Sequence, residues 1–91
     1  MHIEFDAPKN DINIRDRGLS FELAANFDFE TAVFQQDSRR DYGEIRLRAL
    51  GYLDGRMHAL VFTETVKGIR VISFRKANKR EVLIYEQETK S

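Results

Sequence analysis

The alternation of apolar and charged residues in the middle of this chain constrains its fold more than any other feature. At the start of the predicted strand of residues 45–53, Ile45, Leu47 and Ala49 alternate with two arginines, a period of two that is typical of a strand with one buried face. The pair Asp54 and Gly55 then favours a tight hairpin turn. Residues 56–64 form the next predicted strand and residues 69–74 the last, so we expect an antiparallel sheet.

Helix signals flank these strands on both sides. Asp6 is a favoured N-cap residue with a proline two positions later, and Gly18 is a favoured C-terminal stop. Ser20 opens a second helical stretch in the N-terminal part of the chain. Asn78 and Glu81 have the spacing of a capping box, which predicts a third helix at the C-terminal end.

Short β-rich runs at residues 3–5 and 31–34 complete a predicted order of β-α-α-β-β-β-β-α. Consecutive strands joined by tight turns imply an antiparallel sheet with helices packed on it. The predicted class is therefore α+β, with two N-terminal helices and one C-terminal helix in a single domain spanning residues 1–91. Ile12 and Ile14 are the apolar positions of the first helix.

Composition excludes several classes of protein. The chain has 91 residues and no cysteine, so a disulfide framework, a thiolate zinc site and a cysteine nucleophile are all excluded. The longest apolar run, residues 59–62, is far too short to span a membrane, and the first residues lack the pattern of a signal peptide. We therefore expect a cytoplasmic domain with no membrane contact. Its small core leaves little stability to spare, which favours a protein partner or a homodimer.

The charge of the chain is zero overall but is divided along the sequence. Lys and Arg together number 15, as do Asp and Glu. Residues 1–38 hold eight acidic and three basic side chains, whereas residues 39–80 hold eleven basic and four acidic ones. Basic residues gathered on one face are what phosphate binding needs, although an ordinary solvated surface could carry the same residues.

Arg70 stands inside an otherwise apolar strand, where a guanidinium needs a partner or an open sheet face. If the hairpin turns about Lys67, Glu64 falls opposite Arg70, and opposite charges across an antiparallel pair attract. One interpretation is a simple cross-strand salt bridge. The other is a carboxylate presented beside a guanidinium, a pairing suited to general-base catalysis and phosphate binding.

Four cations surround the predicted start of the last helix: Arg75, Lys76, Lys79 and Arg80. Because a helix N-terminus already favours anions, these cations suggest a bound anion, unless they simply point into solvent. His58 shares a strand face with Glu64 if the alternation holds, and neither His58 nor His2 has a companion at metal-ligand spacing. Tyr85 is suited either to stacking on a base or to burial in the core.

Several stretches of the sequence together resemble the BrnT family of toxins. The first part of the resemblance is Phe5-Asp6, Lys9-Asn10, Asn13-Ile14, Gly18 and Ser20-Phe21-Glu22, followed by Asp41-Tyr42-Gly43-Glu44 and Ala49-Leu50-Gly51. The clearest part is Val61-Phe62-Thr63-Glu64, Ile69-Arg70-Val71-Ile72-Ser73 and Arg75-Lys76-Ala77, with Glu81 and Tyr85 after them. The resemblance covers nearly the whole chain and keeps the order of these motifs.

This resemblance implies a compact RelE-like fold and a toxin of a type II toxin–antitoxin module. Members of the family cleave RNA and thereby arrest translation. Each is neutralised by a BrnA antitoxin, a ribbon-helix-helix DNA-binding protein, and the complex represses its own operon. Glu64 and Arg70 match the family's proposed active-site acid and arginine, and Arg75, Lys76 and Arg80 match its basic segment.

The resulting hypothesis is a ribonuclease that needs neither a metal nor another cofactor, because the ribose 2′-hydroxyl can attack its own phosphodiester. Glu64 is the predicted base, and Arg70 and Arg75 are predicted to stabilise the developing charge. Four further residues are predicted to contact the RNA: Lys76 and Arg80 at flanking phosphates, with His58 and Tyr85 as candidates for the leaving-group acid. The alternatives are a non-catalytic nucleic-acid-binding module and a structural adaptor.

Overall fold

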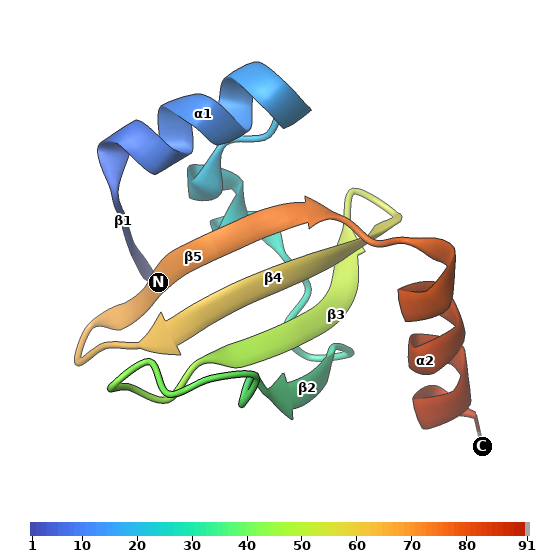
Figure 1. Ribbon diagram of the computed structural model, residues 1–91. Coiled ribbons are helices and arrows are strands. Elements are labelled where there is room, and N and C mark those ends of the chain that lie inside the picture. The colour runs from blue at the N-terminus through green and yellow to red at the C-terminus, as the bar shows by residue number, and fades with distance from the viewer. Residues whose placement is uncertain (91) are drawn as a thin grey trace.

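The structure is a computed structural model that describes residues 1–90, and it has the predicted order of elements (Figure 1). These elements are β1 (His2–Phe5), α1 (Ala7–Arg17), η1 (Phe21–Asn26), β2 (Val33–Gln36), β3 (Leu47–Leu53), β4 (Arg56–Glu64), β5 (Gly68–Lys76) and α2 (Lys79–Thr89). The class is α+β, as predicted. None of the helices in residues 1–90 is long and apolar enough to cross a membrane.

The second N-terminal helix differs from the prediction because η1 is a 3₁₀ helix rather than an α-helix. Its buried side chains recur every third residue, at Phe21, Ala24 and Phe27. A 3₁₀ helix has three residues per turn, so this spacing places all three on the side that faces the sheet.

Within residues 1–90, the sheet has five strands in the order β1-β5-β4-β3-β2. The pairs β2–β3, β3–β4 and β4–β5 are antiparallel, but β1 pairs with β5 in parallel. The prediction of a fully antiparallel sheet is therefore wrong at this edge. It relied on hairpins between consecutive strands, whereas β1 joins a strand more than sixty residues further along the chain.

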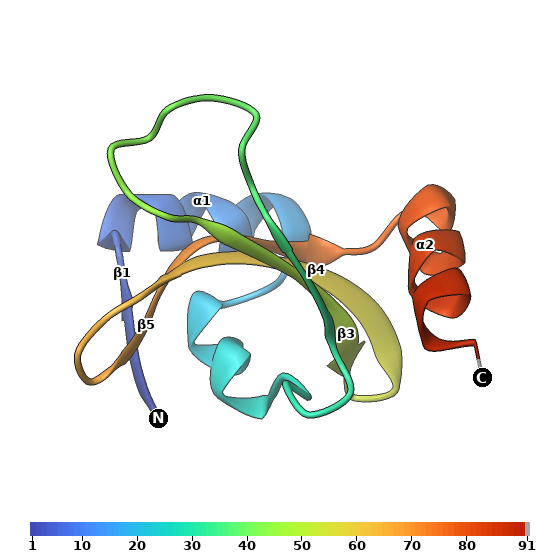
Figure 2. The same cartoon turned by 90° about the horizontal axis from the view of Figure 1, so that it is seen from below.

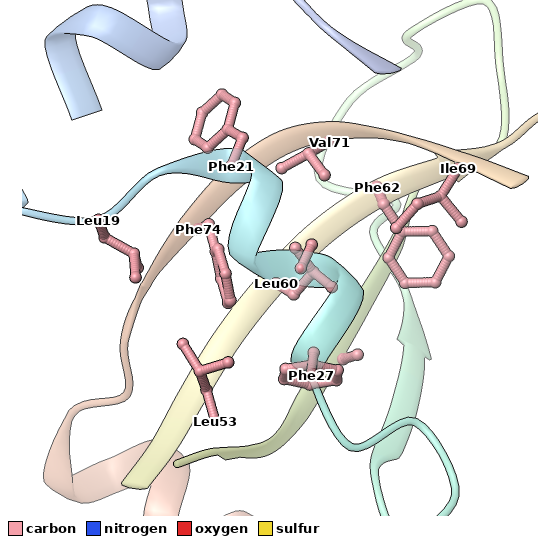
Figure 3. Packing of buried hydrophobic residues seen from close by; sticks show 11 residues of the cluster. Leu19, Phe21, Phe27, Leu53, Leu60, Phe62, Ile69, Val71 and Phe74 are labelled. Carbon is pink, nitrogen blue, oxygen red and sulfur yellow. The ribbon is translucent and has the colours of Figure 1, made fainter. Parts of the chain in front are cut away.

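The main core lies on one face of the sheet, which we call the η1 face. There, η1 and the residues around it cover the central strands (Figure 3). The large buried side chains of this core are Leu19, Phe21, Phe27, Leu53, Leu60, Phe62, Ile69, Val71 and Phe74. On the opposite face, the α2 face, a smaller core joins Tyr85 of α2 to Leu50, Met57 and Ala59. The loop of residues 37–46 lies on the other side of the sheet from η1 (Figure 2).

Helix α1 contacts the core through asparagines rather than through its isoleucines. Ile12 is 48% exposed and Ile14 is 44% exposed, whereas Asn10 and Asn13 are buried. The amide nitrogen of Asn13 donates to the carbonyl oxygens of Leu19 and Phe74, both at 2.9 Å. Because β1 pairs only with the first half of β5, the carbonyl of Phe74 lies on an open sheet edge, and the Asn13 amide satisfies it.

The helix caps and the hairpin turn predicted from the sequence are confirmed. Asp6 accepts a hydrogen bond from the backbone of Lys9, and Gly18 ends α1 in the left-handed region. Asn78 and Glu81 form a capping box in which each side chain bonds the other residue's backbone. The Asp54–Gly55 turn has positive φ at both residues, as a tight type I′ hairpin requires.

Candidate functional site

Arginine side chains gather on the α2 face of the sheet, beyond the end that α2 covers. Arg48 on β3 and Arg75 on β5 lie on either side of β4, facing residues 61 and 59 respectively. Together with the loop of residues 37–46 they line a cleft of about 140 Å³. Its polar lining consists of Asp37, Arg39, Arg46, Arg48, Ser73 and Arg75, and we call it the arginine cleft.

A β-bulge brings Arg70 and Arg75 to the same face of the sheet. The two residues are five positions apart, so a regular strand would point them to opposite faces. The register of β4 and β5 shifts between Val61 and Phe62, which leaves one extra residue in β5. As a result Arg70 pairs with Thr63 and Arg75 with Ala59, two β4 residues that share a face. The sequence pattern gave no sign of this bulge.

Arg75 is held by a buried carboxylate at the start of α2. Its Nη1 and Nη2 donate to Oε1 and Oε2 of Glu81 at 2.7 and 2.9 Å. These hydrogen bonds lower the pKa of Glu81 and raise that of Arg75. Glu81 also accepts from the backbone of Asn78. The anion that meets this cation at the start of the last helix is therefore a residue of the chain itself, while Lys79 and Arg80 are exposed.

A second ion pair orders the loop above the cleft. The Arg39 guanidinium donates to both carboxylate oxygens of Asp37, at 2.8 and 2.9 Å. These bonds lower the pKa of Asp37 to about 2. The backbone N–H of Asp37 donates to the carbonyl of Arg46 at 2.7 Å, which closes the loop. The Arg46 guanidinium stacks over the ring of Tyr42 at 4.0 Å from its centroid.

Arg70 bonds a carboxylate other than the predicted one. Its Nη2 donates to both carboxylate oxygens of Glu44, at 2.8 and 2.9 Å. The Nε of Arg46 lies 3.9 Å from the same carboxylate, which is too far for a hydrogen bond. The Nε atoms of Arg46 and Arg70 are both buried and have no hydrogen-bond partner within residues 1–90. Buried donors are costly when unsatisfied, and neither of these Nε atoms is accessible at the surface.

The predicted pairing of Glu64 with Arg70 is wrong. Glu64 pairs with Ile69, and Arg70 with Thr63. The turn is centred half a residue earlier than expected, with the Thr65 backbone N–H donating to the carbonyl of Gly68 at 2.9 Å. A shift of one residue moves a side chain to the other face. Glu64 is therefore exposed on the η1 face, whereas Arg70 lies on the α2 face.

The remaining predicted site residues lie apart from the arginine cleft. His58 is buried on the η1 face and pairs with Lys76 across the strands, so it does share a face with Glu64. Tyr85 is buried, and its hydroxyl donates to the carbonyl of Thr31 at 2.9 Å. Its ring packs edge-on against Tyr52, which makes Tyr85 part of the smaller core.

In the part of the chain that the structure describes, no three His, Asp or Glu side chains gather closely enough to hold a metal ion. A family model described as the ribonuclease toxin BrnT of a type II toxin–antitoxin system matches residues 5–81, a span that includes every residue of the arginine cleft. No curated protein matches the chain. The chain therefore belongs to the family of BrnT ribonuclease toxins of type II toxin–antitoxin systems.

Proposed function

We propose that this chain cleaves RNA without a metal ion and that the arginine cleft binds the RNA backbone during the reaction. The observation that carries the proposal is the gathering of the guanidiniums of Arg39, Arg46, Arg48 and Arg75 around one cleft. They belong to a group of five guanidiniums, from Arg39 to Arg75, that meets three carboxylates within residues 1–90. The excess positive charge suits a phosphodiester.

The proposed reaction is attack by the ribose 2′-hydroxyl on the adjacent phosphodiester. A base takes the 2′ proton, the 2′ oxygen forms a bond to phosphorus, and the bond from phosphorus to the 5′ oxygen breaks. The leaving oxygen takes a proton from solvent, and the base returns its proton to solvent. The products are a 2′,3′-cyclic phosphate and a 5′-hydroxyl, so atoms and charge balance without a cofactor.

The cleft supports this reaction because its cations are held in place before RNA arrives. Negative charge grows on the phosphate oxygens as the pentavalent transition state forms, and fixed donors stabilise such charge without reorganising. Glu44 holds Arg70 and Glu81 holds Arg75. In this proposal Arg75 keeps its predicted role, and Arg46 and Arg48 join it. Arg70 binds a flanking phosphate because it lies outside the cleft lining, and Lys76 and Arg80 bind the RNA backbone nearby.

The cellular consequences follow from the same proposal. Cleavage of RNA in the cytoplasm would arrest translation, and a BrnA-type antitoxin of the ribbon-helix-helix class would neutralise it. We also propose that the fold is RelE-like and that the toxin pairs with a second copy inside the toxin–antitoxin complex. The family supports a protein antitoxin as partner, because a type II antitoxin is a protein.

Incubation of the purified chain with RNA in the presence of EDTA tests the proposal. We expect cleavage products that end in a 2′,3′-cyclic phosphate, and a loss of at least tenfold in rate for Arg70→Ala. Lys67→Ala, an exposed cation in the β4–β5 turn, is the matched control and should cleave normally. Stable RNA binding without products would contradict the proposal and favour a non-catalytic binding module. The variant Glu64→Gln tests the base that the sequence suggested.

A further inference from the structure

A second basic hollow lies beside the arginine cleft, between the end of α1 and the end of β5. Its volume is about 460 Å³, and its lining consists of Arg17, Gly18, Leu19, His58, Arg75 and Lys76. The lining contains no carboxylate. Arg75 also lines the arginine cleft, so the two hollows meet at this residue. We call the second one the His58 hollow.

The hydrogen bond of His58 fixes which ring nitrogen carries the proton. Its Nδ1 lies 2.7 Å from the carbonyl oxygen of Arg56. A carbonyl oxygen can only accept, so Nδ1 must be the donor. The neutral ring therefore carries its lone pair on Nε2. The side chain is 4% exposed and its ring packs against Phe74 at 5.5 Å, so the surrounding core fixes its orientation.

Of the three cations that line this hollow, Arg75 is paired with Glu81, and the other two have no partners of their own. Arg17 and Lys76 form neither an ion pair nor a side-chain hydrogen bond within residues 1–90. They come from different elements, Arg17 from the last turn of α1 and Lys76 from the strand position paired with His58. An imidazole beside two unpaired cations and the Glu81-bound Arg75 is suited to take a proton from a bound group whose neighbouring phosphate those cations hold.

The entrance to the hollow is open on the side of β5. Strand β1 covers β5 only as far as Val71, and α1 ends at Gly18, which has no side chain. A Cβ built at Gly18 would have no heavy atom within 4 Å, so space remains at this rim. Because Arg75 lines both the arginine cleft on the α2 face and the His58 hollow, an RNA backbone bound in both would pass around the edge of β5 at this residue.

We propose that His58 is the base that takes the 2′ proton and that Arg17, Arg75 and Lys76 hold the phosphate under attack. The inference rests on the proposed ribonuclease function and specifies where in the site the reaction occurs. The 2′ proton moves to Nε2 of His58, the 2′ oxygen bonds to phosphorus, and the 5′ oxygen leaves with a proton from solvent. The imidazolium then gives its proton back to solvent. Arg70, which lies outside the lining of the cleft, binds a flanking phosphate.

His58→Asn is the variant that tests this role most directly. An asparagine amide can replace Nδ1 as donor to the Arg56 carbonyl, but it has no group at the position of Nε2. We expect single-turnover cleavage at saturating RNA to fall at least 100-fold, while the affinity for RNA changes less than threefold. Added imidazole should restore part of the activity of His58→Ala.

A matched pair on α1 keeps the proposal testable if changes at the buried histidine prevent folding. Arg15 and Arg17 both lie in the last turn of α1, but Arg15 pairs with Asp16 and does not line the hollow. Arg17→Ala should lower the cleavage rate at least tenfold with an unchanged melting temperature, and Arg15→Ala should leave it unchanged. Equal rates for wild type and Arg17→Ala would overturn the proposal.

The outcomes separate this inference from the proposed function. If the wild-type chain does not cleave RNA, both fail. If wild type cleaves and folded His58→Asn cleaves equally well, His58 is not the base while the ribonuclease proposal stands. In that case a loss of cleavage in Glu64→Gln would identify Glu64 as the base instead.

Discussion

The arginine cleft and the His58 hollow both collect cations at the C-terminal half of β5, but their charges are held differently. In the cleft, Arg39 and Arg75 each bond a carboxylate at 2.7 to 2.9 Å. In the hollow, Arg17 and Lys76 have no such partner within residues 1–90. A paired guanidinium is fixed in position but partly neutralised, whereas an unpaired cation keeps its full charge and is mobile. The comparison suggests that the cleft orients RNA and the hollow attracts the phosphate to be cut.

Loss of the carboxylate that orders the cleft should have the largest effect. Glu81→Ala removes both hydrogen bonds to Arg75 and one half of the capping box. We expect the free energy of unfolding to fall by about 3 kcal/mol, measured by urea denaturation. Glu88→Ala, an exposed carboxylate on the same helix, is the control and should change it by less than about 0.5 kcal/mol. Similar midpoints for the two variants would show that Glu81 does not organise the cleft.

Asn13 supports the structure around the His58 hollow, and its loss should lower the free energy of unfolding by less than the loss of Glu81 does. Asn13→Ala leaves the carbonyls of Leu19 and Phe74 without their donor, which we expect to lower the free energy of unfolding by about 2 kcal/mol. Because Asn13 ties the last turns of α1 to β5, Arg17 should also lose its position and cleavage should slow, while RNA affinity at the cleft stays within a few-fold. Asn26→Ala, an exposed asparagine at the end of η1, is the control. An Asn13→Ala protein with wild-type stability would contradict this account.

Local signals were sufficient to predict the order of elements but not the geometry of the site. The cap at Asp6, the stop at Gly18 and the Asp54–Gly55 turn each depend on a few neighbouring residues, and all three are confirmed. The parallel pairing of β1 with β5 depends on contacts across almost the whole chain, which no local pattern reports. The buried asparagines of α1 were missed for a similar reason, because the partner of Asn13 is the distant Phe74.

The sequence predicted that the candidate site is rich in basic residues, but it did not predict how those residues are arranged on the sheet. The basic character of residues 39–80 indicated a cationic face, and the structure places Arg48, Arg70 and Arg75 on one face. Which side of the sheet each cation occupies depends on the bulge in β5 and on the exact centre of the β4–β5 turn. Each of them changes the pairing of β4 with β5 by one residue, which the alternation of apolar and polar side chains does not reveal. That is why Glu64 and Arg70 were paired in the prediction and are on opposite faces in the structure.

The salt dependence of RNA binding compares the two regions directly. Each lost phosphate contact should reduce the slope of log affinity against log salt concentration by about 0.7 for single-stranded RNA. Arg48→Ala tests the cleft and Lys76→Ala tests the hollow, and neither side chain bonds a carboxylate within residues 1–90. We expect both variants to lower the slope, with Lys67→Ala as the unchanged control. A change in only one of them would mean that RNA occupies only that region.

The smallest expected effect is the pH dependence of the pair that orders the loop above the cleft. Hydrogen bonds from Arg39 lower the pKa of Asp37 from 3.8 to about 2. Because the folded pKa is the lower one, ionised Asp37 stabilises the fold above about pH 4, and this contribution is lost as the pH falls towards 2. Arg39 is largely exposed, so solvent screening keeps the contribution below about 1 kcal/mol. Melting temperatures between pH 5 and 2 should fall less steeply for Asp37→Asn than for wild type. Arg39→Ala should flatten the curve in the same way, and a wild-type pH dependence in Arg39→Ala would show that the pair is not its cause.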